Sequence, residues 1–250
     1  MMNYNRVFVR GDTHGYFDWL PDWCEENHTT TNDLLIILGD AGILYYGAKK
    51  AREKALKEFI SKCPITLFCV RGNHEARPSD YTSTCFESWG NDPVVEDGWY
   101  FEQEYPNIKY IADGTIFYLN DKKCLAIGGA YSVDKEYRLL MGWRWFANEE
   151  LTDEEMCNIL DKIDHQSFDY VFTHTCPEDW QPTDLFLSGI NQSKVSKRME
   201  QFLTTVSEII DFKHWYFGHF HDDRENIDYN PTHSGQGNVS MLFNKIVRVM

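Results

Sequence analysis

Val7-Phe8-Val9-Arg10-Gly11-Asp12-Thr13-His14 is a short apolar run that ends in an aspartate and a histidine. The β-branched and aromatic residues at its start predict a buried strand, and the glycine allows a tight turn after it. The two polar residues therefore follow the carboxyl end of a strand, which is where α/β sheets bind their ligands. A single Asp-x-His of this kind is weak evidence for a site.

Four further apolar runs end in residue types that bind metal ions. Residues 34–40 end in Gly39-Asp40, 65–75 in Arg71-Gly72-Asn73-His74-Glu75, 170–174 in Thr173-His174, and 215–221 in Gly218-His219-Phe220-His221. Any one of these histidines, taken alone, is more often a surface or core residue. The five junctions together hold five of the nine histidines, and chance is a poor explanation of that pattern. We expect the five junctions to meet at one edge of a sheet.

The rest of the chain predicts a layered α/β sandwich. Strands are expected at 7–9, 34–38, 65–70, 116–119, 124–127, 170–172 and 215–217, and helices at about 15–27, 47–62, 149–164 and 191–210. Thr152 and Glu155 have the spacing of a capping box. The stretch 77–112 has no clear period and is expected to be an irregular insertion that shapes a substrate pocket. No linker divides the chain, so residues 1–250 are expected to form a single domain.

Composition narrows the class of protein. Hydrophobic residues make up 42% and charged residues 25%, and charges interrupt every apolar run well before the roughly 18 residues of a membrane span. The net charge of −15 argues against broad binding of nucleic acid, although bound metal ions can hold a phosphate in an acidic protein. Seven cysteines without a Cys-x-x-Cys pair favour buried free thiols. A cytoplasmic protein without a membrane partner is expected.

The donor types at the five junctions indicate transition metals. Imidazole, carboxylate and amide ligands together suit a borderline divalent cation better than Ca or Mg. There are too many ligands for one tetrahedral ion and enough for two that share a carboxylate. We expect two divalent ions (Mn, Fe, Zn, Ni or Co, with Mn favoured), about 3.5–4 Å apart, which clamp phosphate oxygens and supply a bridging hydroxide. His74 is the candidate proton donor, and Glu75 either tunes His74 or is a structural carboxylate.

The five junctions, in this order, resemble the calcineurin-like metallophosphoesterase superfamily over residues 10–221. The resemblance implies a four-layer α-β-β-α sandwich of two mixed β-sheets. It implies that one ion is held by Asp12, His14, Asp40 and His221, and the other by Asp40, Asn73, His174 and His219, with Asp40 bridging. It also gives His74 the position of the catalytic histidine.

Within that superfamily the second junction departs from the protein Ser/Thr phosphatases, which the first and third blocks (11–15 and 71–75) resemble. Those enzymes follow Gly-Asp with an Asp-Arg-Gly segment whose arginine binds phosphate, whereas Asp40 is followed by Ala41 and Gly42. Residues 128–132, 143–149 and 173–177 are more similar to a bacterial and phage-borne metallophosphatase branch. Arg138 is a candidate replacement for the missing arginine, with a surface ion pair as the alternative.

The expected function is therefore hydrolysis of phosphate monoesters, either small molecules or phosphoproteins. The metal-bridging hydroxide attacks phosphorus, His74 protonates the leaving oxygen, and Asn73 and Arg138 contact the substrate. A phosphodiesterase or nuclease acting on cyclic nucleotides or nucleic acid would use the same five junctions, and the negative charge makes long nucleic acids the less favoured substrate. A metal-containing binding protein without turnover is the alternative outside the enzymes.

Overall fold

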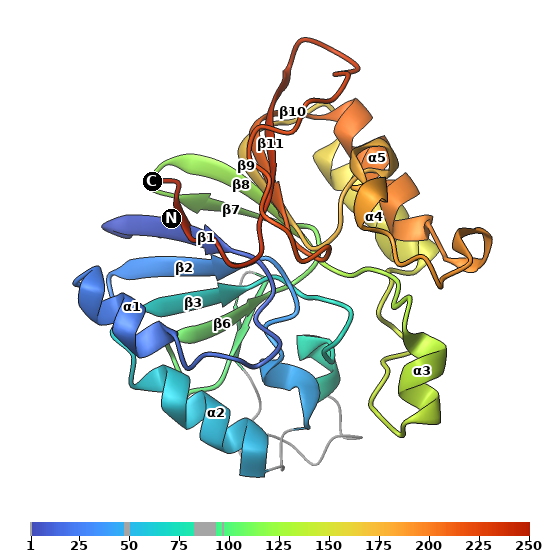
Figure 1. Ribbon diagram of the computed structural model, residues 1–250. Helices are drawn as coiled ribbons and strands as arrows, with labels where there is room; N and C mark the ends of the chain where they lie inside the picture. The colour runs from blue at the N-terminus through green and yellow to red at the C-terminus, as the bar shows by residue number, and fades with distance from the viewer. Residues whose placement is uncertain (1, 48–50, 83–93, 97) are drawn as a thin grey trace.

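Two mixed β-sheets form the centre of the computed structural model, which describes residues 2–47, 51–82, 94–96 and 98–250 (Figure 1). The seven-stranded sheet has the spatial order β12 (Val247–Arg248), β1 (Arg6–Arg10), β2 (Asp33–Ile37), β3 (Thr66–Cys69), β6 (Ile108–Ile111), β5 (Trp99–Phe101), β4 (Val94–Glu96). The five-stranded sheet has the order β11 (Gln236–Met241), β10 (Asp211–Phe217), β9 (Ser167–Thr173), β8 (Lys122–Ile127), β7 (Thr115–Leu119).

The central strands of each sheet are parallel, so their carboxyl ends meet at the same edge. Strands β1, β2, β3 and β6 are parallel to one another, as are β8, β9, β10 and β11. Antiparallel strands β12, β5, β4 and β7 complete the two sheets. The parallel order places every predicted strand-end junction on one side of the molecule, as the sequence indicated.

Alternate side chains of each strand point to opposite faces of its sheet, and this explains the layers. Val7 and Val9 of β1 face the interior between the two sheets, and so do Cys124 and Ala126 of β8. Phe8 of β1 points the other way, into a second core. Because each central strand is buried on both faces, its sequence reads as a continuous apolar run.

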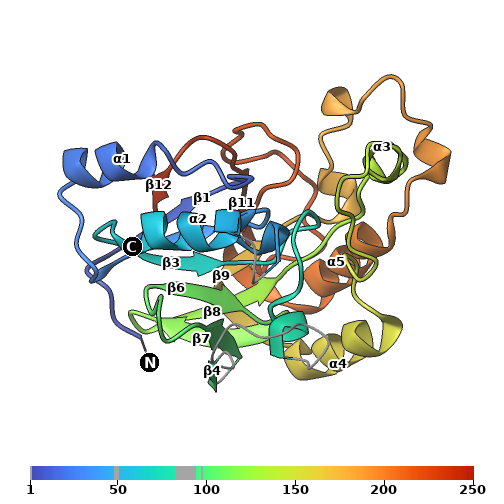
Figure 2. The ribbon, with the colours of Figure 1, turned by 90° about the horizontal axis from the view of Figure 1, so that it is seen from below.

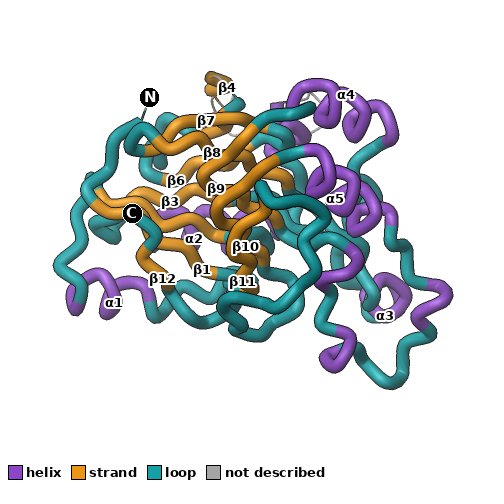
Figure 3. The backbone as a smooth tube through the Cα atoms, turned by 90° about the horizontal axis from the view of Figure 1, so that it is seen from above, coloured by secondary structure: helices purple, strands orange, loops and turns teal. Residues whose placement is uncertain are grey.

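Helices cover both outer faces, and the expected four-layer α-β-β-α sandwich is confirmed. Helices α1 (Leu20–Glu26) and α2 (Ala51–Ser61) pack on the seven-stranded sheet, burying Leu20, Cys24 and Ile60 with it. Helices α4 (Asp153–Ile163) and α5 (Arg198–Ile209) contact each other on the outer face of the five-stranded sheet (Figure 3). The short helix α3 (Lys135–Leu140) stands away from both sheets (Figure 1).

Five 3₁₀ turns lie in the loops, and three of them shape the region beyond the strand ends. The turns are η1 (Ile43–Tyr45), η2 (Pro78–Thr82), η3 (Glu178–Trp180), η4 (Thr183–Leu185) and η5 (Gln192–Lys194), counted over the residues that the structure describes. Figure 2 shows α3 beside the segment that carries η3 to η5, on the side toward which the parallel strands run.

The helices are shorter than the sequence predicts, and a side-chain cap explains the later start of α4. Helix α4 begins at Asp153 rather than 149, since Thr152 and Glu155 form the predicted capping box, with Thr152 Oγ1 accepting from the Glu155 amide at 3.2 Å. Helices α1 and α5 begin at Leu20 and Arg198 rather than 15 and 191, and the η5 turn precedes α5. The predicted helix at 47–62 is α2, and its residues 48–50 lie outside the described part of the chain.

The expectation that 77–112 is irregular is wrong where the structure describes it. Strands β4, β5 and β6 fall within this stretch and extend the seven-stranded sheet beyond β3. Their short length and aromatic, mixed-polarity sequence hide the two-residue period, and strand pairing fixes them instead: β6 pairs with β3, β5 with β6, and β4 with β5. Residues 83–93 and 97 of the predicted insertion lie outside the described residues.

The predicted free thiols are confirmed for the six cysteines that the structure describes. Five of them are buried and Cys157 is exposed. Within the described residues, no helix is both long enough and apolar enough to cross a bilayer.

Candidate metal centre

The five strand-end junctions meet at one edge of the two sheets, as predicted. Three groups of side chains each bring their ligand atoms within 4.8 Å of one another: Asp12, His14 and His221; His14, Asp40 and His74; and Asp12, Asp40 and His174. These residues follow β1, β2, β3, β9 and β10, so strands from both sheets contribute. The two sheets therefore build the centre jointly.

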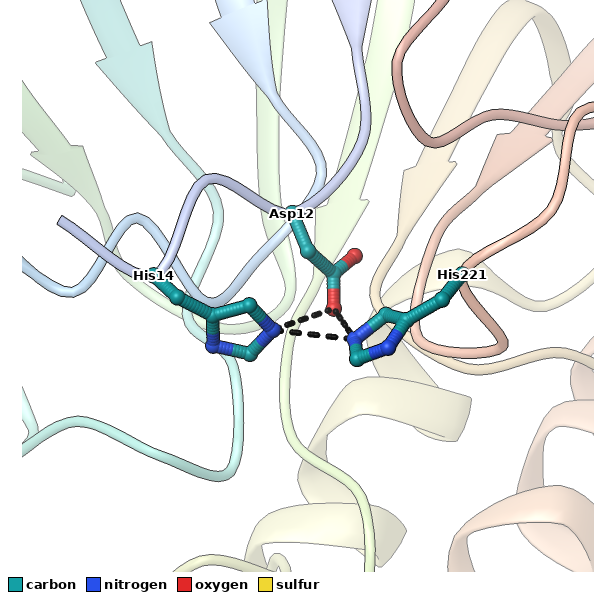
Figure 4. Close-up of side chains that lie close together, drawn as sticks. All are labelled: Asp12, His14 and His221. Atoms are coloured by element: carbon teal, nitrogen blue, oxygen red, sulfur yellow. Dashed lines mark hydrogen bonds and ion pairs between the residues drawn. The ribbon is translucent and has the colours of Figure 1, made fainter. Parts of the chain in front are cut away.

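The first group joins β1 to β10. Nε2 of His14 lies 2.9 Å from Nε2 of His221, and Oδ2 of Asp12 lies 3.3 Å from the same His221 atom. Figure 4 shows the two rings and the carboxylate facing a common point. Two imidazole nitrogens and a carboxylate oxygen in this arrangement are a suitable donor set for a borderline divalent cation.

His174 and Asn73 face each other at the centre. Nδ1 of His174 lies 2.8 Å from the Leu38 carbonyl oxygen, which can only accept, so Nδ1 carries a proton, and in the neutral ring the Nε2 lone pair points into the centre. That Nε2 atom lies 2.8 Å from Oδ1 of Asn73.

The orientation of the Asn73 amide is fixed from its other side. Nδ2 of Asn73 donates to Ser132 Oγ at 2.9 Å, and Ser132 Oγ donates in turn to Glu149 at 2.5 Å. Oδ1 of Asn73 therefore faces His174, and when the ring is neutral two lone pairs meet with no proton between them. A cation bound by both atoms would resolve this arrangement, so the donor set fits a metal ion.

In each of the two buried aspartates, one carboxylate oxygen accepts from a backbone amide and the other is left for the centre. Oδ1 of Asp12 accepts from the His219 amide and Oδ1 of Asp40 from the His74 amide, both at 2.8 Å. Oδ2 of Asp12 is buried and has no hydrogen-bond partner among the described residues. A buried carboxylate oxygen without a donor is unfavourable unless a cation occupies its open side.

The charge state of these aspartates suits metal binding. Burial acts to raise the pKa of Asp12, but His174 and His221 outweigh it and hold the pKa below its ordinary value. The pKa of Asp40 is likewise lowered, because His74 and His174 outweigh the effect of burial. Burial lowers the pKa of His219 to about 3, so that ring is neutral at physiological pH. These three groups therefore need no deprotonation before a cation binds.

Backbone strain is concentrated at the same residues. His14, Asp40, His219 and His221 have φ of 48°, 46°, 68° and 56°, the left-handed region that non-glycine residues seldom adopt. The neighbouring glycines allow these tight turns: a Cβ at Gly72 would overlap Asp40, and one at Gly39, where φ is +89°, would overlap the His174 ring. Gly39 and Gly72 thus allow the neighbouring segments to approach closely.

His74 lies at the edge of the centre between three charged groups. Its Nδ1 atom is 2.8 Å from Nη2 of Arg138 and 3.3 Å from Oδ2 of Asp40, and its Nε2 atom is 3.4 Å from Oδ1 of Asp134. Asp134 also accepts from Arg138 Nε at 2.8 Å. Burial acts to lower the pKa of His74, but Asp40 and Asp134 outweigh it and raise the pKa above its ordinary value.

The comparison with protein families agrees with this geometry. A family model described as calcineurin-like phosphoesterase matches residues 6–223. The chain belongs to the calcineurin-like phosphoesterase family. The resemblance in the sequence is thereby confirmed, and the family implies a dinuclear divalent metal centre and a phosphate-ester substrate. The open donor atoms of Asp12, Asn73 and His174 fit such a centre.

Solved structures similar to this phosphoesterase share little sequence with it. Phosphopantetheinyl hydrolase from Mycobacterium tuberculosis is 12% identical, with 96% of this chain and 90% of that one covered and a TM-score of 0.44. Another solved structure is 15% identical, with 98% of both chains covered and a TM-score of 0.49. No curated protein is similar enough in sequence to be matched.

Glu75 is buried next to the centre and accepts hydrogen bonds from two of its loops. Its side chain is 3% exposed, and it accepts from the amides of Gly72 at 3.0 Å and Gly42 at 3.2 Å. Burial and the Asp40 charge raise its pKa to about 8. The contacts join the loops after β2 and β3 and favour the structural role over tuning of the His74 ring.

The sequence did not predict three residues that position His74 and Asn73. Asp134 faces His74, while Ser132 and Glu149 orient Asn73. A weak signal for Asp134 is present, since it stands four residues before the candidate Arg138. No signal marks Glu149, because its link to Ser132 is made in space between two loops.

Proposed function

We propose that this phosphoesterase is a phosphomonoesterase with two divalent cations, Mn being the favoured ion. The observation that carries the proposal is the convergence of open donor atoms from five strand ends beside His74. One ion would be held by Asp12, His14, Asp40 and His221, and the other by Asp40, Asn73, His174 and His219. When bound, the ions supply charge stabilisation for the phosphate and a nucleophile near neutral pH.

His74 is the proposed proton donor to the leaving oxygen. Asp134 and Asp40 lie 3.4 Å and 3.3 Å from its two ring nitrogens and favour the charged ring that such a donor needs. Its pKa, raised above the ordinary value, is in keeping with that role.

Arg138 supports a monoester rather than a diester substrate. Its side chain is 8% exposed, and two of its nitrogens bind Asp134 and His74. Nη1 makes a longer contact of 3.4 Å with the Arg144 carbonyl and is the atom proposed to bind a phosphate oxygen. A monoester dianion offers one more charged oxygen than a diester, so a guanidinium beside the proton donor favours the monoester.

The test compares two chromogenic esters on protein stripped with chelator and refilled with Mn, Zn, Ni or Mg. We expect kcat/KM for p-nitrophenyl phosphate to exceed that for bis(p-nitrophenyl) phosphate at least about tenfold, which is about 1.4 kcal/mol of transition-state preference. Preference for the diester would replace the proposal by a phosphodiesterase. Two bound ions without turnover of either ester would favour a binding protein.

A further inference from the structure

A cavity of about 280 Å³ lies beside the metal centre. Asp40, Asn73, His74 and His219 belong to its wall, so it opens onto the proposed reacting atoms. Six apolar side chains of the wall come from the segment between β9 and α5, together with one residue after β10: Leu185, Phe186, Leu187, Ile190, Val195 and Phe220. The metal chemistry uses none of these six side chains, and such a wall suits the carbon skeleton of a substrate.

This apolar wall is fixed to the rest of the protein. Trp180 is buried against Trp215 in the core under the five-stranded sheet, with ring centroids 5.1 Å apart. Asp184 accepts two hydrogen bonds from Arg224, at 2.9 and 2.7 Å. The segment is therefore anchored at Trp180 and Asp184, just before the residues that line the cavity.

One wall residue, Glu200, is a buried carboxyl group with an unused oxygen. Its side chain is 3% exposed, and Oε1 accepts from Thr175 Oγ1 at 2.8 Å. Oε2 is buried and has no hydrogen-bond partner among the described residues. A buried acceptor of this kind is unfavourable unless a ligand or another group donates to it.

The charges around the cavity favour a positively charged hydrogen-bond donor in the ligand. The wall carries the carboxyl groups of Asp40, Asp134 and Glu200, and its three histidines, His74, His219 and His221, lie at the metal centre; none of its described residues is lysine or arginine. Burial, with the nearby charges of Glu150 and Glu178, raises the pKa of Glu200 to about 7. A cation close to Oε2 would gain from the ionised carboxylate, so a charged donor fits better than a neutral one.

We propose that Glu200 binds the ammonium group of the substrate, and that the substrate is a phosphate monoester of an apolar amino alcohol. This inference rests on the proposed phosphomonoesterase function. Water is the co-reactant: the phosphorus–oxygen bond of the ester breaks, and the products are the free amino alcohol and inorganic phosphate. The apolar side chains contact the carbon chain, and the ammonium group donates to Oε2.

The test uses matched pairs of esters and a binding measurement that needs no turnover. 4-Aminobutyl and 6-aminohexyl phosphate are each compared with butyl and hexyl phosphate. Wild-type protein, Glu200→Gln and the control Glu178→Gln are assayed; Glu178 pairs with Lys197 at the surface. Calorimetric titration with hexylamine and with 1-hexanol measures binding directly. We expect kcat/KM for one amino ester to exceed that of its partner at least about tenfold, a preference of about 1.4 kcal/mol.

Glu200→Gln is expected to remove this preference and to weaken hexylamine binding at least fivefold, while Glu178→Gln leaves both unchanged. Equal kcat/KM within both pairs, or a preference that survives Glu200→Gln, overturns the inference while p-nitrophenyl phosphate turnover still supports the phosphatase. Hexylamine binding that depends on Glu200, without hydrolysis of any ester, upholds the ammonium site and overturns the phosphatase instead. Equal binding of hexylamine and hexanol counts against the site, because Glu200 then serves the fold alone.

Discussion

Arg138 donates a hydrogen bond to His74 across 64 positions of sequence, with Nη2 2.8 Å from Nδ1 of the ring. A guanidinium has no acceptor, so in the neutral ring Nδ1 accepts and Nε2 carries the proton, while in the charged ring Nδ1–H has Oδ2 of Asp40, 3.3 Å away, as its acceptor. Oδ1 of Asp134 lies 3.4 Å from that Nε2 atom. Arg138 and Asp134 thus select one tautomer of His74 between them, and the predictions for this residue follow from that arrangement.

Replacement of His74 by alanine should remove the proton donor and leave the metal ligands in place. We expect kcat for p-nitrophenyl phosphate to fall by about 10²–10⁴-fold, the usual contribution of a general acid. Metal content, measured by elemental analysis, should match the wild type. His165→Ala is the control, because the His165 side chain is 88% exposed and outside the centre. Equal kcat in His74→Ala would contradict the assigned role.

Asp134→Asn should act through the position and charge of His74. Asp134 helps to raise the pKa of His74, so its loss should lower kcat roughly 10-fold, within the range of a supporting group. The limb of the pH–kcat profile that reports the acid should move to lower pH. Glu136→Gln, on the exposed face of α3, is the matched control. A lower kcat with an unshifted profile would indicate a structural role instead.

The sequence predicts that the candidate metal donors lie close together, because each one follows a buried strand. Residues at strand ends are placed by the sheet itself, so the parallel order of β1, β2, β3, β9 and β10 converts sequence junctions into neighbours in space. The contacts of Asp134 with His74 and of Glu149 with Ser132 obey no such rule, since they join loops. Strand β6 was missed for a related reason: its four residues are fixed by pairing with β3.

Asp40→Asn should cost the centre both ions, because the proposed bridge loses its charge. Asparagine can still accept from the His74 amide, so the loop after β3 should keep its conformation. We expect metal affinity to fall by more than the roughly 10–100-fold that loss of a supporting group costs. Titration of chelator-treated protein measures it, with exposed Asp18→Asn as the control. Retention of two tightly bound ions would contradict the bridging assignment.

Arg71→Ala should destabilise the fold, because Arg71 joins the loop after β3 to Asp113 and Glu149. Arg71 is 3% exposed; its Nε donates to Asp113 at 2.8 Å and its Nη1 to the Glu149 carbonyl at 2.6 Å. Loss of one partner of a buried pair costs about 3–5 kcal/mol. Urea unfolding of chelator-treated protein measures the change. The exposed pair Lys54–Glu58 provides a control, because Lys54→Ala should change the free energy of unfolding by at most about 1 kcal/mol.

Glu200→Gln should change how the free energy of unfolding depends on pH. Burial raises the pKa of Glu200 from the ordinary 4.5 to about 7. Between these values the folded state binds the proton more tightly than the unfolded state does. The stability contributed by protonated Glu200 is therefore complete below pH of about 4.5 and is lost as the pH rises through about 7. At 1.36 kcal/mol per pKa unit the loss amounts to about 3 kcal/mol.

Glutamine stays neutral, so the variant should gain stability relative to wild type as the pH increases. Urea unfolding of chelator-treated protein at several values between pH 5 and 8 measures this difference, which should grow by about 2–3 kcal/mol over the range. Glu178→Gln should follow the wild-type curve much more closely, because the pKa of Glu178 is lowered by its hydrogen bond with Lys197. Parallel curves for wild type and Glu200→Gln would mean that Glu200 is ionised in the folded protein across this range. An ionised carboxylate with an open oxygen in an apolar cavity would then need a resident cation to hold it there.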